Sequence, residues 1–308
     1  MQKKENIERV NRKMKDTFAA YHPIINFTFF CTVIICGMFF MHPVLLCISV
    51  AAAFSYSVYL NGRRAVKFNL IFVLPAMIAV SAINPLFHHS GMTILGYAGN
   101  NPITLESICY GMVAGLMFAS IILWFSCYNA VMTSDKFIYL FGGIAPALSL
   151  IFAMVLRFVP KFKTQIITIS NAQKCIGRDV NNGSYPERVR HGIKILSIMV
   201  TWALENAIET ADSMRSRGYG LKGRTSFSIF RFDARDKGLL LVIMVFIAVM
   251  SAGSAAGQTN IQYFPSIAIG EISGFSVLIY SAYFLLCFTP IILNVMEEVK
   301  WHYFRSGI

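Results

Sequence analysis

Runs of about 20 residues without a charged side chain recur along this sequence, and they constrain its fold more than any other feature. A helix of about 20 residues crosses the hydrocarbon core of a bilayer, which is about 30 Å thick, so such runs predict transmembrane helices. Asp, Glu, Lys and Arg are absent from six of these stretches, at residues 24–40, 43–60, 68–87, 107–128, 238–256 and 273–294. The sequence therefore predicts about six membrane spans.

The composition agrees with a membrane protein and argues against other classes. Hydrophobic residues make up 56% of the chain and charged residues 14%, which exceeds what a globular core needs. Six Lys and Arg precede the first span, and further apolar segments follow it, so we expect that span to remain as an anchor and not to be a cleaved signal peptide. None of the seven cysteines forms a CxxC pair, which favours small buried hydrophobes over a disulfide framework.

The distribution of Lys and Arg predicts which side of the membrane each loop faces. Short loops retain these cations on the cytoplasmic side. With a cytoplasmic N-terminus and six crossings, all 27 Lys and Arg fall in cytoplasmic pieces, fifteen of them in residues 157–237. The two longer external loops, residues 88–106 and 257–272, contain none. We therefore expect both termini to be cytoplasmic.

A seventh apolar stretch, residues 137–156, does not fit this topology as a span, because crossing there would place the fifteen cations outside. Gly142, Gly143 and Pro146 also interrupt a straight helix within it. We interpret the stretch as interfacial or re-entrant.

The basic segment that follows is predicted to contain two helices. An earlier one runs from about Pro160 to Cys175 and is ended by a turn at residues 181–183. The later one begins near Pro186 and ends at Gly218 and Gly220, which gives about 30 residues. Apolar side chains repeat along it at three- and four-residue spacing, at Leu196, Val200, Ala203, Ala207, Ala211 and Met214. We expect this stripe to pack against the neighbouring helix or against a membrane partner.

Sites for chemistry are sparse. All fifteen Asp and Glu lie in loops or at span edges, which argues against coupling to an ion gradient.

Residues 218–225 nearly match a phosphate-binding loop, but Arg224 replaces the Lys of that loop and a helix precedes it, so we expect no ATP site. His88 and His89 make an incomplete metal site. Glu205, Glu209 and Asp212 share one helix face and are interpreted as a solvated surface, with a basic partner surface as the alternative.

The end of the second basic helix carries the most specific pattern. It reads Ala-Asp-Ser-Met-Arg-Ser-Arg-Gly-Tyr-Gly over residues 211–220, with Gly-Arg-Thr at 223–225. Together with residues 84–87, 102–104, 110–111 and 156–161, it resembles the transmembrane T component of energy-coupling factor (ECF) transporters, the CbiQ/EcfT-like family. The resemblance covers most of residues 84–225.

This resemblance implies a function and a docking site. In that family, two short Ala/Ser-Arg-Gly motifs at helix ends insert into grooves of two ABC-type ATPase subunits, and a separate membrane-embedded S subunit binds the substrate. The second motif is intact as Ser216, Arg217 and Gly218. The first is degenerate, with Gly177 and Arg178 but no arginine at its centre. Read without the resemblance, Arg217 equally well stabilises the C-terminus of its own helix.

The sequence as a whole predicts an all-α integral membrane protein with about six transmembrane helices and a cytoplasmic amphipathic coupling-helix segment. We expect an N-terminal tail with four spans in residues 1–136, the coupling segment in 137–237, and two spans with a tail in 238–308. The predicted function is that of a non-enzymatic, cofactor-free coupling subunit of an ATP-driven micronutrient importer in the cell membrane. A stand-alone transporter or channel is the first alternative, and a membrane-embedded enzyme the second.

Overall fold

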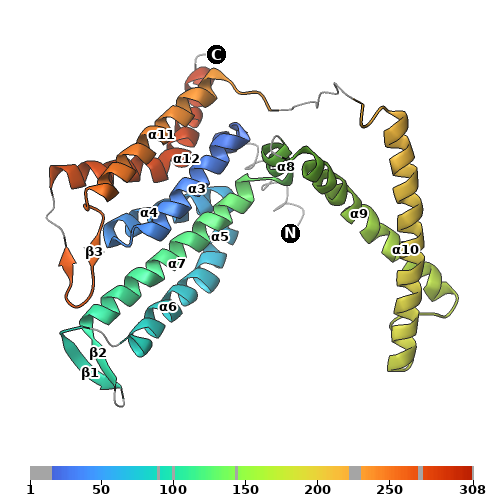
Figure 1. Cartoon of the computed structure of the whole chain (residues 1–308), viewed down its shortest axis with the longest axis horizontal. Coiled ribbons are helices and arrows are strands. Elements are labelled where there is room, and N and C mark those ends of the chain that lie inside the picture. The colour runs from blue at the N-terminus through green and yellow to red at the C-terminus, as the bar shows by residue number, and fades with distance from the viewer. Residues whose placement is uncertain are drawn as a thin grey trace. The chain divides into compact units, whose positions relative to one another are not determined.

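The structure is a computed structural model that describes residues 16–88, 91–98, 101–142, 145–221, 230–269 and 273–306 (Figure 1). The chain divides into two compact units. One contains the residues up to Lys136 and from Phe230 onward, and we call it the bundle unit. The other runs from Phe137 to Ile229, and we call it the helix-pair unit.

The bundle unit consists of apolar helices. They are α2 (Thr17–Ala20), α3 (Pro23–Phe39), α4 (Pro43–Asn61), α5 (Arg63–Phe68), the π-helical segment η1 (Asn69–Val73), α6 (Leu74–Phe87), α7 (Leu105–Val131), α11 (Ala234–Ala255) and α12 (Gly274–Ser306). Among the described residues, five helices are long and apolar enough to cross a membrane, with α5, η1 and α6 counted as one, and α3 is a shorter apolar helix of 17 residues. The prediction of an all-α membrane protein with about six spanning helices is confirmed.

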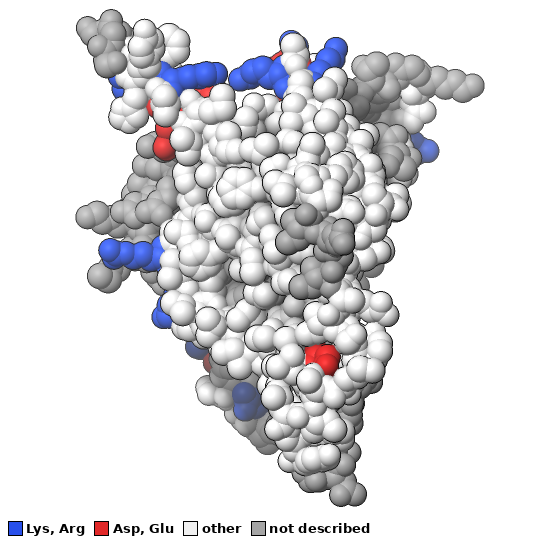
Figure 2. Space-filling view, turned by 90° about the vertical axis from the view of Figure 1, so that its left-hand side faces the viewer, with Lys and Arg blue, Asp and Glu red and all other residues white. Residues whose placement is uncertain are grey.

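The surface of the bundle unit has the charge distribution that the sequence predicts for a membrane protein. Figure 2 shows a face whose centre is free of Lys and Arg, with a group of these cations at its upper edge. Cations at the start of α11 and the end of α12 include Arg235, Lys237, Lys300 and Arg305. A hydrocarbon layer therefore meets apolar side chains on this face, because the charged groups lie at the helix ends.

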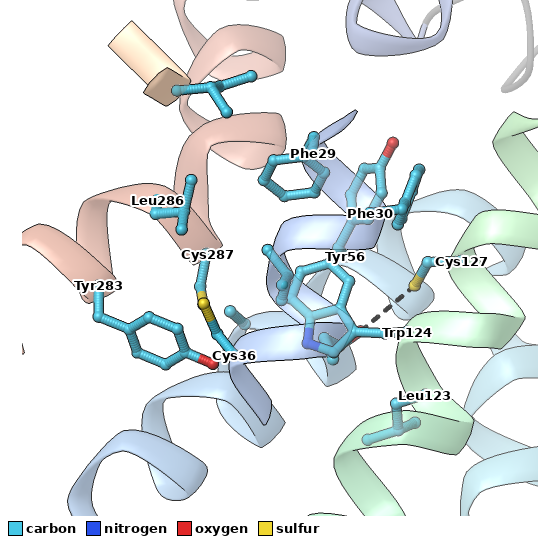
Figure 3. Packing of buried hydrophobic residues seen from close by; sticks show 14 of the residues in the cluster. Phe29, Phe30, Cys36, Tyr56, Leu123, Trp124, Cys127, Tyr283, Leu286 and Cys287 are labelled. Atoms are coloured by element: carbon cyan, nitrogen blue, oxygen red, sulfur yellow. Dashed lines mark hydrogen bonds between the residues drawn. The ribbon is translucent and has the colours of Figure 1, made fainter. Parts of the chain in front are cut away.

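The core of the bundle unit is aromatic (Figure 3), and a group of polar side chains within it is paired. Phe29 and Phe30 meet the ring of Trp124 edge to face at 5.8 and 6.2 Å. The indole N–H of Trp124 donates to Ser49 Oγ at 2.9 Å, and Ser49 Oγ lies 2.7 Å from Ser120 Oγ. Because a polar group left unpaired in an apolar interior is costly, these pairs fix the relative positions of α4 and α7.

A buried polar anchor, which the sequence did not predict, fastens the residues before α3 to the bundle. The Asp16 carboxylate is 4% exposed, and it accepts hydrogen bonds from Tyr56 Oη at 3.0 Å and Asn294 Nδ2 at 2.8 Å. The amide oxygen of Asn294 in turn accepts from the backbone N–H of Thr17 at 2.8 Å. These bonds join the start of α2 to α4 and α12, and they place Phe18 in the aromatic core.

Two small antiparallel ladders occupy the loops that the sequence predicts to be external. Strands β1 (Ile94–Ala98) and β2 (Asn101–Thr104) lie between α6 and α7. Strands β3 (Ile261–Gln262) and β4 (Ala268–Ile269) lie between α11 and α12. Figure 1 shows β1, β2 and β3 at one end of the bundle unit. The sequence predicted loops at these positions and did not predict the short strands.

The helix-pair unit contains α9 (Pro146–Cys175) and α10 (Tyr185–Ser216), preceded by α8 (Ser134–Gly142), which begins in the bundle unit. The predicted interruption is confirmed, because α8 ends at Gly142 and Pro146 opens α9, while Gly143 lies outside the described residues. The predicted start of the earlier helix near Pro160 is wrong, since α9 continues through that proline. Proline removes one backbone hydrogen bond, and the rings of Phe158 and Phe162 stack across this position with their centroids 5.9 Å apart.

Close packing of α6 on α7 depends on two glycines. A Cβ atom at Gly111 would lie 2.6 Å from the carbonyl oxygen of Ser81, and one at Gly115 would lie 2.7 Å from that of Met77. The spacing Gly111-x-x-x-Gly115 places both on one face of α7, where small residues let two membrane helices approach closely.

We expect Gly115→Ala to lower the free energy of unfolding by about 1–3 kcal/mol, because the added methyl group overpacks a contact with backbone atoms. The matched control is Gly238→Ala on α11, where an added Cβ meets nothing within 4 Å. Thermal unfolding of the purified protein in detergent measures both variants. Equal unfolding temperatures would contradict the close approach of α6 and α7.

Candidate functional site

Helix α10, which carries the predicted docking motif, begins at a well-defined cap. The backbone N–H and the hydroxyl of Ser184 donate to the Glu187 carboxylate at 2.9 and 2.8 Å. These bonds, led by that of the backbone N–H, lower the pKa of Glu187. The helix then runs for 32 residues to Ser216, close to the predicted length.

The end of α10 is closed by a Schellman motif, in which two backbone N–H groups beyond the helix bond back to its last turn. Gly218 N–H donates to the carbonyl of Arg215 and Tyr219 N–H to that of Met214, both at 3.0 Å. Gly218 has φ +75°, a left-handed conformation that suits glycine. Arg217 is the last residue before this turn, and its side chain is exposed. The cap therefore presents Arg217 at the tip of the helix.

The end of α9 is closed by the same motif. Gly177 N–H donates to the carbonyl of Lys174 at 3.0 Å and Arg178 N–H to that of Gln173 at 2.9 Å, with Gly177 at φ +79°. Position by position, Ile176 therefore corresponds to Arg217 and Gly177 to Gly218. Arg178 corresponds to Tyr219, two residues beyond the tip. The structure thus gives both predicted docking motifs one backbone geometry and places an isoleucine at the centre of the first.

The charge around the two tips differs as well. At the end of α9, Lys174 forms an ion pair with Asp179 at 3.4 Å. The N–H of Asn181 is the main cause that lowers the pKa of Asp179, and Lys174 adds to it. At the end of α10, Arg217 and Arg215 are both exposed. Exposed cations therefore flank both tips, Lys174 and Arg178 in α9 and Arg215 in α10. The residue at the tip itself is cationic in α10 (Arg217) and apolar in α9 (Ile176, 61% exposed).

The two tips are not brought together. Only residues 176–184 separate the end of α9 from the start of α10, so the tip of α9 lies near the beginning of α10. A helix of 32 residues is about 48 Å long, and Arg217 is at its far end. Figure 1 shows α9 and α10 crossing, with these two ends well apart.

The helices cross on a small apolar cluster. Ile169 on α9 packs with Ile195 and Met199 on α10, and Phe162 and Trp202 meet edge to face at 5.5 Å. Lys161 Nζ lies 5.2 Å from the centre of the Trp202 ring. This contact uses a different face of α10 from the stripe that the sequence predicted, in which Leu196 and Val200 are 62% and 51% exposed. The alternative that the stripe packs on the neighbouring helix is therefore wrong for this chain.

An apolar stripe on α10 is left open to its surroundings. Its large side chains are Val189, Ile193, Leu196, Val200, Leu204 and Ile208, all exposed. On the opposite side Glu205, Glu209 and Asp212 are also exposed, as expected of a solvated face. The helix thus has an α9-facing side, an open apolar side and an acidic side.

The remaining sequence candidates form no site among the described residues. Residues 222–225, the second half of the near-match to a phosphate-binding loop, lie outside the described residues, as does His89. The ring of His88 lies 6.1 Å from that of Phe264 in the bundle unit. Within the described part of the chain, no three His, Cys, Asp or Glu side chains gather as a metal site would require.

Fold and site together define a multi-pass helical membrane protein with a pair of long crossing helices that carry exposed charged and apolar surfaces. Residues 22–229 match the family model of CbiQ, described as a cobalt transport protein. Because this match covers more than half of the sequence, the chain belongs to the CbiQ family, and the resemblance seen in the sequence is confirmed.

Individual relatives carry the name energy-coupling factor transporter transmembrane protein EcfT. The one from Streptococcus thermophilus is 28% identical over 54% of this chain and 68% of that protein. The one from Leuconostoc gelidum is 24% identical over 63% and 74%. The one from Lactobacillus helveticus is 31% identical over 33% of this chain, and the match spans only 38% of that protein's length.

We expect Gly218→Ala to weaken the cap of α10 by about 1 kcal/mol, because an L-residue is strained at a left-handed φ. Hydrogen exchange at the Gly218 and Tyr219 amides should then be about fivefold faster, measured by mass spectrometry of the purified protein. Gly192→Ala, inside the same helix, serves as the control and should stabilise it. Unchanged exchange in Gly218→Ala would refute the capping role.

Proposed function

We propose that this chain is the transmembrane coupling subunit of an ATP-driven ECF-type importer. The observation that carries the proposal is the presentation of Arg217 at the capped end of α10, at the docking position of the CbiQ family. In the proposed assembly two ABC-type ATPase subunits hydrolyse ATP, and an S subunit in the membrane binds the micronutrient, a vitamin or a transition metal. The chain itself is neither an enzyme nor the holder of a cofactor.

The proposed topology places the helix pair in the cytoplasm together with both termini. The arrangement of the 27 Lys and Arg supports it, since one side of the membrane then receives all of them. Residues 137–237 form the coupling segment in this scheme, between the spans of residues 1–136 and 238–308. The exposed Lys and Arg of α9 and α10 need water or a charged partner, and both are present on the cytoplasmic side.

Arg217 suits docking into a protein groove. A guanidinium stays charged and offers five N–H donors in a fixed fork, so it can bond a carboxylate and several carbonyls at once. The Schellman cap uses the local backbone N–H groups and leaves the side chain free to extend beyond the helix. We infer that this group fills a groove of one ATPase subunit.

The helix pair is suited to transmit movement. When ATP binding draws the ATPase subunits together, the tips of α9 and α10 are carried with them, and the crossing point at Ile169, Ile195 and Met199 makes the helices move as one lever. The S subunit reorients in response. This mechanism requires that the tips stay attached throughout the cycle.

We expect Arg217→Glu to abolish association with the ATPase subunits, because a carboxylate removes the donors and repels an acidic groove. Pull-down of the tagged chain from membranes, followed by mass spectrometry, measures it. Arg190→Glu, the same charge change near the other end of α10, should leave association intact. Undiminished association and transport in Arg217→Glu would rule out the assignment.

The open apolar stripe of α10 supports the docking of an S subunit. Burying each of its large side chains gains about 1.5–3 kcal/mol, and in this chain α9 covers another face. A hydrophobic membrane subunit that slides on such a surface can rotate without breaking directional bonds.

We expect the double substitution Leu196→Glu and Val200→Glu to release the S subunit while retaining the ATPase subunits, since it places charge on the stripe and spares both tips. Thr201→Glu, off the stripe, is the control. Quantitative mass spectrometry of the purified complex reports both partners. Retention of the S subunit by the double variant would contradict the proposed contact.

A further inference from the structure

The uncharged part of the chain continues beyond the end of a membrane helix. Residues 68–105 contain no Asp, Glu, Lys or Arg, whereas α6 ends at Phe87. The rest of this run forms the β1–β2 hairpin and leads back to α7. Figure 1 shows the hairpin beyond the ends of α6 and α7. The hairpin is therefore as free of charge as a membrane span, although it is not helical.

The surface of the hairpin is apolar as well. Four large side chains on it or just before it are 52–73% exposed, namely Met92, Ile94, Leu95 and Tyr97. The second ladder differs, because Tyr263, between β3 and β4, is 7% exposed and its hydroxyl donates to the carbonyl of Met41 at 2.6 Å. The second ladder thus packs on the bundle, whereas the hairpin directs apolar side chains outward.

The carboxylate next to the hairpin is turned away from this surface. Glu106, which follows the uncharged run, is 4% exposed. Its Oε1 accepts hydrogen bonds from the backbone N–H of Thr93 at 3.2 Å and from the Thr93 hydroxyl at 2.5 Å. These bonds fasten the start of the hairpin to the start of α7. The base of the hairpin is therefore fixed, and the charge of Glu106 does not interrupt its apolar surface.

Helix length places the hairpin at one surface of the hydrocarbon layer. The helical stretch from Arg63 to Phe87 has 25 residues and is about 37 Å long, so it crosses a hydrocarbon core of about 30 Å. Arg63, Arg64 and Lys67 keep its first turns at one surface, and Phe87 then reaches the opposite one. Near that end Leu86 and Phe87 are exposed, and the hairpin continues their apolar surface.

We propose that the β1–β2 hairpin lies in the lipid headgroup region of the leaflet opposite Arg63 and Lys67, where Ile94, Leu95 and Tyr97 contact lipid and hold the α6–α7 pair at a fixed depth. Tyrosine suits this region because its ring is apolar and its hydroxyl can bond water or headgroups. The proposal involves no partner subunit, so it does not rest on the proposed function.

The backbone limits how deep the hairpin can lie. A two-stranded ladder leaves two outer edges with unpaired N–H and C=O groups, and hydrocarbon cannot satisfy them. The headgroup region supplies water and polar groups for these edges and apolar chains for the side chains. A position in bulk water would satisfy the edges but leave the large apolar side chains hydrated.

Spin-label depth measurements on the full chain in liposomes of phosphatidylcholine and phosphatidylglycerol test the proposal. A directly encoded p-acetylphenylalanine that carries a nitroxide replaces Leu95 or Tyr97, so the seven native cysteines stay in place. Exposed Ile78 of α6 and Glu209 of α10, labelled in the same way, are the references for hydrocarbon and water. Power saturation compares collisions with oxygen, which concentrates in lipid, and with a nickel chelate, which stays in water.

We expect the oxygen-to-nickel collision ratio at positions 95 and 97 to be severalfold above that at position 209 and below that at position 78. With the label at position 97, the double substitution Ile94→Glu and Leu95→Glu should lower the ratio to that of the water reference. Ile94→Val with Leu95→Val, which keeps the surface apolar, should retain it. Both residues are exposed, so neither pair of changes disturbs the core of the bundle unit.

Four results would overturn the inference. A ratio equal to that at position 209 would place the hairpin in water, and one equal to that at position 78 would place it in hydrocarbon. Few collisions with either reagent would mean that protein, such as a second copy of the chain, covers the hairpin. An unchanged ratio in the double glutamate variant would show that the apolar side chains do not hold it there.

Discussion

The bilayer offers no hydrogen bonds, and the architecture of the bundle unit follows from that constraint. Each backbone N–H and C=O must find a partner within the protein, so the spanning segments are helices and the short strands are confined to the loops between them. The same constraint acts on side chains. Ser49, Ser120 and Trp124 satisfy one another in the aromatic core, and the Asp16 carboxylate is held by Tyr56 and Asn294.

The helix-pair unit is stabilised differently. Its α9–α10 contact is a small cluster around Ile169, Ile195 and Met199, although the two helices have 30 and 32 residues. The two helices are therefore long although the core between them is small. Their ends are stabilised by local capping hydrogen bonds. Ser184 and Glu187 fix the start of α10, and glycines at φ +75° and +79° close the ends of α10 and α9. Such helices can stay helical to their ends without a large core, because their termini are capped by their own residues.

Sequence patterns predicted the features that depend on composition over many residues. Charge-free runs predicted the spans, and proline and glycine signals predicted both ends of α10. Sequence patterns were less informative where a single contact determines a helix boundary or the face on which a helix packs. Pro160 signalled a helix start, yet the flanking apolar residues carry α9 through it. The apolar repeat at Leu196 and Val200 was found, but periodicity does not say which of two apolar faces meets α9. Burial of Asp16 requires a partner 278 residues away, at Asn294, and no local pattern encodes that.

The docking motifs illustrate what structure adds to a resemblance. Along the sequence, Ser216-Arg217-Gly218 is intact, and the first motif only lacks an arginine, with Arg178 nearby. The amino-acid sequence alone does not say which residues of the two motifs correspond. The hydrogen bonds of the caps do, because they fix the position of each residue relative to the preceding helical turn. On that alignment the glycines are equivalent and Ile176 stands where Arg217 does. The backbone is thus the same at the two tips, and the difference between them lies in the side chain that each cap presents and not in how each helix ends.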